Sequence, residues 1–194
     1  MVEKITYLQI EIIALYRGNY LKSIYIREMA SLLNKSHVTL LPHLKSLESK
    51  NILFQKTIGK NKTYTLNLNN IQTKLYLNHS ELLKTSQFLE KYPSLKTFLK
   101  EITLNIPIIV FGSFAKLSAN KNSDIDILVI TNTKPALPSH GLPNKIHLTH
   151  LTEKNFTKAQ QEKEPLMKEI EKNHIILNNH SFYINELWNN YGKQ

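Results

Sequence analysis

The sequence contains no cysteine. This absence excludes a disulfide framework, thiolate zinc sites and cysteine nucleophiles, and it is typical of a reducing, intracellular setting. Long hydrophobic runs are also missing, since none approaches the roughly 20 apolar residues needed to cross a bilayer. The N-terminal segment carries Glu3, Glu11 and Arg17 among its apolar residues, unlike a secretory leader. We therefore expect a cytoplasmic protein without a membrane partner.

The hydrophobic content and the charge of the sequence indicate its domain number and its class of partner. Of its 194 residues 41% are hydrophobic, enough for the core of one domain or of two small ones. The net charge is +10, and residues 1–70 contain ten Lys and Arg against four Asp and Glu. A basic N-terminal third favours a polyanionic partner, with nucleic acid as the first candidate. A lysine-rich surface kept for solubility is the alternative.

The N-terminal third has an ordered series of short elements. The periodicity predicts helices over residues 5–16 and 27–34 with a short strand at 23–26 between them. We expect the helix at 27–34 to bury Met29, Ala30, Leu32 and Leu33. A third helix over 37–50 has Ser36 as its N-cap and an apolar residue at every third position: Val38, Leu41, Leu44 and Leu47. Strands at 52–58 and 62–68 are joined across Gly59, Lys60 and Asn61, which indicates a hairpin.

This order of elements resembles a winged helix-turn-helix domain over residues 1–69. The resemblance implies that the third helix enters a major groove of double-stranded DNA and that the hairpin contacts the backbone. The DNA-binding residues would then be Ser36, His37, Thr39, Leu40, His43, Lys45, Lys56, Lys60 and Lys62. Pro42 opposes an undisturbed third helix, because proline in a helix interior costs ~3 kcal/mol. The same module used for dimerisation or protein contacts is the alternative.

The rest of the chain changes character twice. Residues 70–104 are expected to form linking helices, with apolar positions at Leu75, Leu82, Leu83 and Leu89 and a second helix opening at Pro93. Apolar or alternating runs then predict strands at 106–112, 124–130 and 145–152. A helix is expected over 152–173, and a final strand and helix over 174–188. The fold class is α+β, with an N-terminal winged helix-turn-helix and a C-terminal mixed sheet flanked by helices.

Two carboxylates, Asp124 and Asp126, lie in the second of these strands. Residues i and i+2 of a strand point to the same face, so the two side chains are neighbours and repel one another unless a cation joins them. Mg²⁺ is the natural ion, because it prefers oxygen ligands and completes its shell with water and phosphate oxygens. The pair Gly112-Ser113 follows the preceding strand, where free backbone N–H groups and a hydroxyl can hold phosphate oxygens. Together they predict a metal-bound polyphosphate site.

The stretch "GSFAKLSANKNSDIDILVI" resembles the signature of the polymerase-β-like nucleotidyltransferases, especially the minimal, prokaryotic and archaeal-like type. The matching residues are Gly112, Ser113, Phe114, Ala115, Lys116, Ser123, Asp124 and Asp126. The resemblance implies transfer of a nucleoside monophosphate from an NTP, with Gly112, Ser113, Lys116 and Ser123 binding nucleotide. Asp124 and Asp126 would be catalytic ligands of Mg²⁺ or Mn²⁺.

The matching residues also have structural explanations. Ser113 and Ser123 can act as caps, Asp124 can close an Asx-turn and Lys116 can be a solvated surface residue. These structural explanations do not account for a carboxylate at Asp126, which lies in mid-strand.

Two positions depart from the family pattern. Leu117 stands where the family usually has glycine. The third acidic residue of active members is missing, because no Asp or Glu occurs between Asp126 and Glu153. His147 is the residue that aligns with it and would act as a metal ligand or a base, although Mg²⁺ prefers oxygen. Glu153 reaching in from beyond the strand, or a vestigial cleft lined by His147, are the alternatives.

The sequence therefore predicts a winged-helix domain at 1–69, a helical linker at 70–104 and a nucleotidyltransferase domain at 105–194. The acceptor would be a protein or a nucleic acid such as RNA, by analogy with minimal members found in toxin–antitoxin pairs. A DNA-binding regulator or antitoxin-like protein, whose second domain senses nucleotide or is silent, is the alternative function. A homodimer is expected if the DNA site is a palindrome, with residues 70–104 as the interface.

Overall fold

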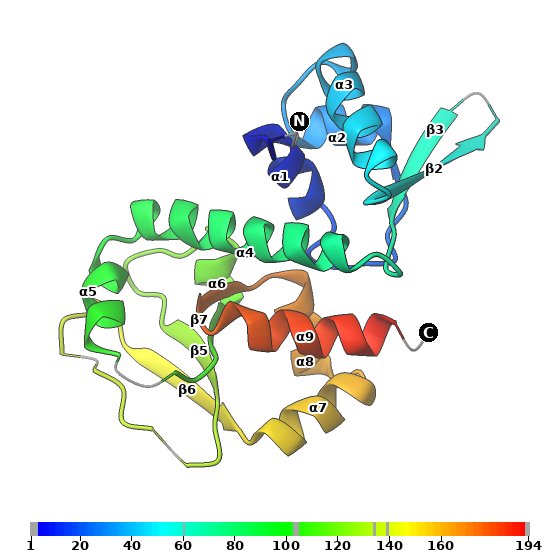
Figure 1. Cartoon of the computed structure of the whole chain (residues 1–194). Helices are drawn as coiled ribbons and strands as arrows, with labels where there is room; N and C mark the ends of the chain where they lie inside the picture. The colour runs from blue at the N-terminus through cyan, green and yellow to red at the C-terminus, as the bar shows by residue number, and fades with distance from the viewer. Residues whose placement is uncertain (1–3, 60, 103–104, 134, 139, 193–194) are drawn as a thin grey trace. The chain divides into compact units, whose positions relative to one another are not determined.

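The chain folds into two compact units. The structure, a computed structural model, describes residues 4–59, 61–102, 105–133, 135–138 and 140–192 (Figure 1). One unit comprises Met1–Ser80 with Tyr191–Gln194, and the other comprises Glu81–Asn190. The division falls inside helix α4 (Ile71–Lys91), which runs without a break. Domain boundaries after residues 69 and 104 stay a prediction. Among the described residues, no helix is both long and apolar enough to span a membrane.

The first unit contains the elements in the order that the sequence predicts. They are α1 (Tyr7–Ala14), β1 (Ile24–Tyr25), α2 (Ile26–Leu32), α3 (His37–Ser49), β2 (Leu53–Ile58) and β3 (Asn61–Leu66). The strands pair antiparallel in the order β1-β3-β2. Helix α1 starts at a capping box, in which Thr6 and Gln9 exchange side-chain-to-backbone hydrogen bonds. Ser36 caps α3 by accepting from the Thr39 N–H, as predicted.

The buried face of α2 differs from the prediction, and the buried face of α3 does not follow its apolar repeat. Val38 is 62% exposed and Leu32 is 56% exposed. Helix α3 instead buries Leu40, Leu44 and Leu47, because a 3.6-residue repeat brings positions 40, 44 and 47 onto one face and leaves position 38 outside it. Leu40 is fully buried, so its predicted contact with DNA bases is wrong. Helix α3 continues through Pro42.

The second unit is a four-stranded mixed sheet with helices. Its strands are β4 (Ile108–Phe111), β5 (Ile125–Ile130), β6 (Ile146–Leu151) and β7 (Ile175–Asn178), in the order β6-β5-β4-β7. Strand β4 is antiparallel to β5 and β7, and β5 is parallel to β6. The helices are α5 (Ser94–Glu101), α6 (Gly112–Ala115), α7 (Glu153–Gln161), α8 (Pro165–Lys172) and α9 (His180–Tyr191). The mixed α+β class is as predicted.

One predicted helix, over 152–173, is two helices in the structure. Helix α7 ends at Gln161 and α8 begins at Pro165. Lys163 between them has a φ of +52°, and proline is tolerated at the start of a helix but not in its interior. The connection therefore turns the chain between two short helices.

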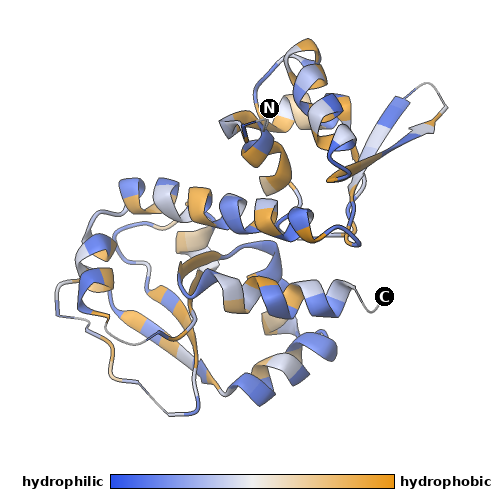
Figure 2. Ribbon diagram, viewed as in Figure 1, coloured by the Kyte–Doolittle hydropathy of each residue, from blue (hydrophilic) through white to orange (hydrophobic). Residues whose placement is uncertain are grey.

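The sheet of the second unit is buried on both faces, since Ile109 and Leu128 are as fully buried as Val110 and Ile127. Ile125, Ile127 and Val129 of β5 pack with residues of β4, β7 and the helices in one buried cluster. Because neighbouring residues of a strand point to opposite faces, Asp126 projects from the other face. Along α4 hydrophobic and hydrophilic residues alternate (Figure 2), and Leu75 and Leu82 are more than half exposed. The buried positions of α4 include Thr73, Ser80, Glu81 and Thr85.

Candidate active site

The site begins at a turn that only glycine fits. Strand β4 ends at Phe111, and Gly112 starts α6 with a φ of +65°. This left-handed conformation is unfavourable for any residue with a Cβ atom. A Cβ atom added to Gly112 would also overlap Asp126 Oδ2 and lie 3.1 Å from its Cγ. The glycine thus lets the backbone of the turn lie directly against a carboxylate.

That carboxylate belongs to Asp126, which lies near the start of β5, between strands β4 and β6. Asp126 pairs with Phe111 of β4 on one side and with His147 of β6 on the other. Its side chain is 26% exposed. Asp124 lies one residue before β5 and is exposed. The two-residue spacing directs both carboxylates to the face that holds the Gly112 turn.

His147 lies directly beside Asp126. Its Nδ1 is 3.0 Å from Asp126 Oδ1, and 69% of its side chain is exposed. If the imidazole is neutral, a proton on Nδ1 is donated to the carboxylate and Nε2 is left as an acceptor. The two oxygens of Asp126 therefore face different groups, Oδ1 the imidazole and Oδ2 the glycine turn.

Leu117 occupies a position with a backbone conformation typical of glycine. The Leu117 N–H donates to Phe114 O and the Ser118 N–H donates to Ser113 O, which is the Schellman arrangement that ends a helix. Leu117 is its left-handed residue, with a φ of +57°. A left-handed φ is the conformation that glycine adopts most readily, so leucine is strained at this position. The leucine side chain is 49% exposed, and Lys91 Nζ donates to the Leu117 carbonyl at 3.0 Å.

The other residues predicted to bind nucleotide have mixed surroundings. Ser113 is half-buried in α6, and within the described part of the chain its hydroxyl has no hydrogen bond. Lys116 Nζ lies 2.9 Å from Glu169 Oε1 of α8, so its charge is already paired. Ser123 Oγ accepts from the Asn120 N–H at 3.0 Å and closes the loop that leads to Asp124. Ser113 is therefore the most available of the three.

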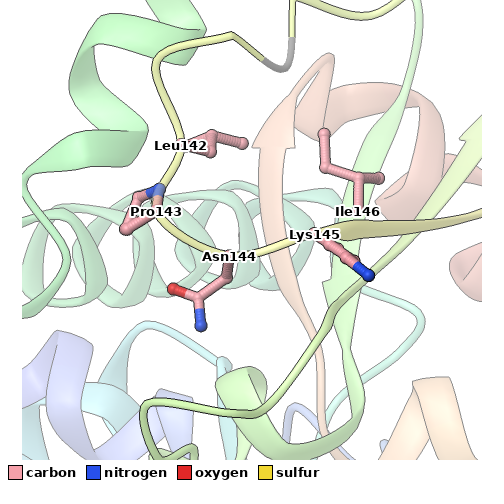
Figure 3. Close-up of a pocket in the computed structure, with 5 residues that line it drawn as sticks. All are labelled: Leu142, Pro143, Asn144, Lys145 and Ile146. Carbon is pink, nitrogen blue, oxygen red and sulfur yellow. The ribbon is translucent and has the colours of Figure 1, made fainter.

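Lys145 is a residue of this face that the sequence prediction missed. The Ile125 N–H donates to the Lys145 carbonyl at 2.8 Å, which brings residue 145 beside the chain at Asp124. Figure 3 shows its side chain leaving the backbone on the side opposite to Ile146. Ile146 pairs with Ile125, so Lys145 shares a face with His147 and Asp124. Its position two residues before His147 in an alternating strand was the signal available in the sequence.

The residues predicted to bind DNA belong to the first unit. Ser36, His37, Thr39, Lys45, Lys56 and Lys62 are exposed. His43 is half-buried, and its Nδ1 lies 3.1 Å from the hydroxyl of Thr6 at the start of α1. Lys60 lies outside the described residues. Among the described residues of this set, Ser36 and Thr39 lie together at the capped first turn of α3, with 2.8 Å between their hydroxyls. Lys56 and Lys62 lie on the paired strands β2 and β3.

The comparison with protein families matches the part of the chain that contains this geometry. Residues 93–179 match the family model described as a nucleotidyltransferase domain. The match includes the Gly112 turn, both aspartates and His147. Neither the curated proteins nor the solved structures gave a match to the chain. The family match supports a nucleotidyltransferase domain at 93–179, and nucleoside monophosphate transfer is the chemistry it suggests.

The donor set of this site suits one divalent cation. Asp124 and Asp126 offer hard oxygen ligands side by side, and water and phosphate oxygens can complete the shell of Mg²⁺ or Mn²⁺. Among the described residues, no group of three or more His, Asp or Glu side chains is placed to hold a metal ion. A second ion with three protein ligands therefore does not fit the side chains described. Glu153 begins α7 and has an exposed side chain.

Proposed function

We propose that the second unit transfers a nucleoside monophosphate from an NTP to a hydroxyl group on a protein or nucleic-acid acceptor. The observation that carries this proposal is the contact between the left-handed Gly112 turn and Asp126. A turn with only a structural role needs a glycine, but it does not need a partly exposed carboxylate in contact with that glycine. A turn that holds phosphate oxygens next to a metal-binding carboxylate needs both.

The chain would bind the NTP through backbone and side-chain donors. The N–H groups of the Gly112–Ser113 turn and the Ser113 hydroxyl would donate hydrogen bonds to the β- and γ-phosphates. Lys145 adds a positive charge on the same face, and it has no ion pair among the described residues. Lys116 contacts phosphate only after it releases Glu169, an exchange of one exposed partner for another.

Asp124 and Asp126 would hold a Mg²⁺ or Mn²⁺ ion together with the substrate. When bound, such an ion stabilises the charge on the phosphates and on the leaving pyrophosphate. His147 would act as the general base, because Asp126 Oδ1 holds the proton on Nδ1 and leaves Nε2 to accept one. The acceptor hydroxyl gives its proton to Nε2, its oxygen bonds to the α-phosphorus, and the bond from this phosphorus to pyrophosphate breaks.

A DNA-binding role for the first unit completes the proposal. Its support is the order of elements, the exposed first turn of α3 and the exposed Lys56 and Lys62 on the β2–β3 hairpin. The same support serves the alternative function, a DNA-binding regulator or antitoxin-like protein with a silent nucleotidyltransferase domain. The observation that favours this alternative is His147 in place of a third carboxylate. A toxin–antitoxin role, a cytoplasmic location and a homodimer stay predictions.

The first experiment incubates the protein with each α-labelled NTP, Mg²⁺ or Mn²⁺ and a cell lysate. We expect a labelled protein or RNA band that the Asp124→Ala/Asp126→Ala variant does not produce. His147→Ala should lower the rate by about 10²-fold or more without changing the KM for NTP, as for loss of a general base. Thr149→Ala, two residues further along β6, is the matched control. Label that persists in the aspartate variant would refute the proposed site.

The second experiment measures duplex DNA binding between low and physiological salt. Binding that weakens steeply with salt, and less steeply in Lys56→Ala/Lys62→Ala, supports the DNA-binding role. Lys154→Ala/Lys158→Ala on α7 removes the same charge from the second unit as a control. DNA binding without any labelled product would make the regulator the better interpretation.

A further inference from the structure

Strand β6 forms an open edge of the sheet in the second unit. It ends the strand order β6-β5-β4-β7, and among the described strands it pairs only with β5. None of its six residues is buried, whereas three of the four residues of β7, at the other edge, are buried. The register of β6 with β5 is continuous, and residues 146–151 contain no Pro, Lys, Arg, Asp or Glu. Proteins commonly protect exposed edges with such residues or with bulges, so β6 is unprotected against pairing with another strand.

The backbone of β6 presents hydrogen-bond donors and acceptors along this edge. The carbonyls of Lys145 and Leu151 accept from the first residue of β5 and from the residue that follows β5, so odd-numbered residues bond to β5. Alternate residues of a strand direct their N–H and C=O groups to opposite edges. The groups of Ile146, Leu148 and His150 therefore point away from β5, and no loop backbone bonds to them within the described part of the chain. An extended peptide supplies donors and acceptors at the matching spacing.

The proposed general base lies on this edge strand. The His147 side chain is 69% exposed, and its Nδ1 is 3.0 Å from Asp126 Oδ1 on the neighbouring strand β5. Nε2 lies on the side of the ring away from that contact, and the open edge of β6 lies on the side of His147 away from β5. A strand added at this edge would run about 4.8 Å from β6. The Cβ atom of its residue opposite His147 would lie about 5 Å from the His147 Cβ atom, which brings a hydroxyl on that residue within reach of Nε2.

The surroundings of the edge indicate which peptide sequence fits it. Ile146 and Leu148 are partly buried and pack against the core cluster, so apolar residues directly before and after the hydroxyl residue would lie beside them. Lys145 shares a face with His147, and its side chain is exposed. Residues 144–152 contain this lysine, two histidines and no Asp or Glu. An acidic residue two positions from the hydroxyl residue therefore complements the charge of the edge.

We propose that the acceptor is an extended acidic peptide segment that pairs with β6 as an added strand and places a Ser, Thr or Tyr hydroxyl at His147. This inference rests on the proposed nucleotidyl transfer and specifies a protein as the acceptor. The phosphate groups of a nucleic acid accept hydrogen bonds but cannot donate to the outward carbonyls of β6. In the transfer the hydroxyl proton goes to His147 Nε2, the hydroxyl oxygen bonds to the α-phosphorus of the NTP, and pyrophosphate leaves.

The binding test uses the Asp124→Ala/Asp126→Ala protein, which lacks the proposed metal ligands and keeps β6. The probes are short peptides that alternate valine with polar residues and carry Ser, Thr or Tyr at the centre, with Glu two positions to either side. We expect at least one peptide to bind with a Kd of ~1 mM or tighter, and its counterpart with Lys in place of Glu to bind about tenfold more weakly. Nuclear Overhauser contacts should join the amide protons of the peptide to those of Ile146, Leu148 and His150.

A proline in β6 tests whether the peptide pairs with the backbone. His150→Pro removes an outward N–H group and leaves the bonds to β5 intact, so it should weaken peptide binding about tenfold, by about 1.4 kcal/mol. His150→Ala is the matched control, because it loses the same side-chain contact with the Thr131 carbonyl and keeps the N–H group. It should bind the peptide as the unsubstituted strand does. The Overhauser contacts need no change in β6, so they decide the proposal even where the proline variant does not fold.

The wild-type protein with labelled NTP then separates this inference from the proposed function. Label on the hydroxyl peptide, and none on the same peptide with alanine at its centre, supports both. Peptides that do not bind at roughly ten times the expected Kd, or that bind without contacts to β6, overturn the inference, and so does an RNA oligonucleotide that is labelled in place of the peptide. A peptide that pairs with β6 and is never labelled would refute the transfer, whereas a labelled lysate protein without peptide pairing would overturn the acceptor alone.

Discussion

His174 and Glu81 form a buried pair, with 3.1 Å between Nε2 and Oε1 and side chains that are 1% and 0% exposed. The other ring nitrogen of His174, Nδ1, lies 2.9 Å from the Ile170 carbonyl. A carbonyl can only accept, so Nδ1 carries a proton and Nε2 shares another with the carboxylate. The Tyr183 ring packs on the imidazole, with 4.7 Å between centroids. The pair ties α4 to the segment that enters β7.

Removing one member of this pair should be costly. We expect Glu81→Ala to lower the free energy of unfolding by about 3–5 kcal/mol, because it leaves a buried imidazole N–H without its acceptor. Urea denaturation measures the change. Glu90→Ala on the same helix breaks the exposed contact with Lys96 and should cost about 0.5 kcal/mol or less. Equal effects of the two variants would contradict the buried pair.

Alanine substitutions at Gly59, Gly112 and Gly141 separate the cost of backbone strain from the cost of steric overlap. Gly112→Ala should cost about 3 kcal/mol and abolish the proposed NMP transfer, because it combines a φ of +65° with overlap on Asp126. Gly59→Ala, with a φ of +62° and open space, should cost only about 1–2 kcal/mol of strain. Gly141→Ala has neither problem and should change stability by less than about 0.5 kcal/mol. Thermal unfolding tests this order, and a Gly112→Ala protein as stable as Gly141→Ala would refute the close approach.

Leu117 offers a stabilising substitution. Leu117→Gly should raise the free energy of unfolding by about 0.5 kcal/mol, since relief of a left-handed φ outweighs the entropy cost of glycine. Leu117→Ala is the control, because it keeps the strain and removes the same half-exposed side chain. A gain with alanine as large as with glycine would show that the side chain, not the backbone, is the source.

The first unit should become less stable at alkaline pH. Burial, and then the charge of Glu28, raise the pKa of Tyr16, whose hydroxyl donates to the Tyr64 carbonyl at 2.9 Å. Above the unfolded pKa of 10.0 the unfolded chain loses this proton and the folded chain keeps it, so stability falls as pH rises. The contribution of Tyr16 has a slope of up to about 1.4 kcal/mol per pH unit.

The Tyr16→Phe variant isolates the contribution of the Tyr16 hydroxyl to the pH dependence of stability. At pH 7 it should cost about 1 kcal/mol for the lost hydrogen bond, and between pH 10 and 11 its urea stability should fall less than that of the wild type. Parallel curves for the two proteins would contradict the buried hydroxyl.

Much of the fold follows from local patterns in the sequence. Every strand of the second sheet begins within two residues of its predicted start, because continuous apolar runs such as Ile108–Phe111 have few alternatives to a buried strand. The turn at Gly112 and the carboxylates Asp124 and Asp126 are predictable from the same contrast, since each departs from its apolar surroundings. The predicted neighbour of Asp126 on the next strand was His147, and the register of β5 and β6 has it there.

The sequence pattern fails where contacts between residues distant in sequence decide which side chains are buried. Helix α4 buries Glu81 and Thr85 and exposes Leu75 and Leu82, because partners distant in sequence satisfy the polar groups: Thr85 Oγ1 donates to the Ile176 carbonyl at 2.7 Å. No local sequence pattern predicts a hydrogen bond between residues that are 91 positions apart. The ion pair between Lys116 and Glu169, 53 residues apart, escapes prediction for the same reason.

Strand β6 is at the edge of its sheet, paired only with β5 in the order β6-β5-β4-β7. Strands β4 and β5, which carry the glycine turn and Asp126, each have two neighbours. Edge strands open locally at lower free energy than central ones, so the amide protons of β6 should exchange with deuterium faster than those of β4. Equal protection of the two strands would contradict this difference. The opening of β6 removes His147 and leaves Gly112 and Asp126 in contact, so this form of the chain keeps the proposed phosphate-binding turn without the proposed base.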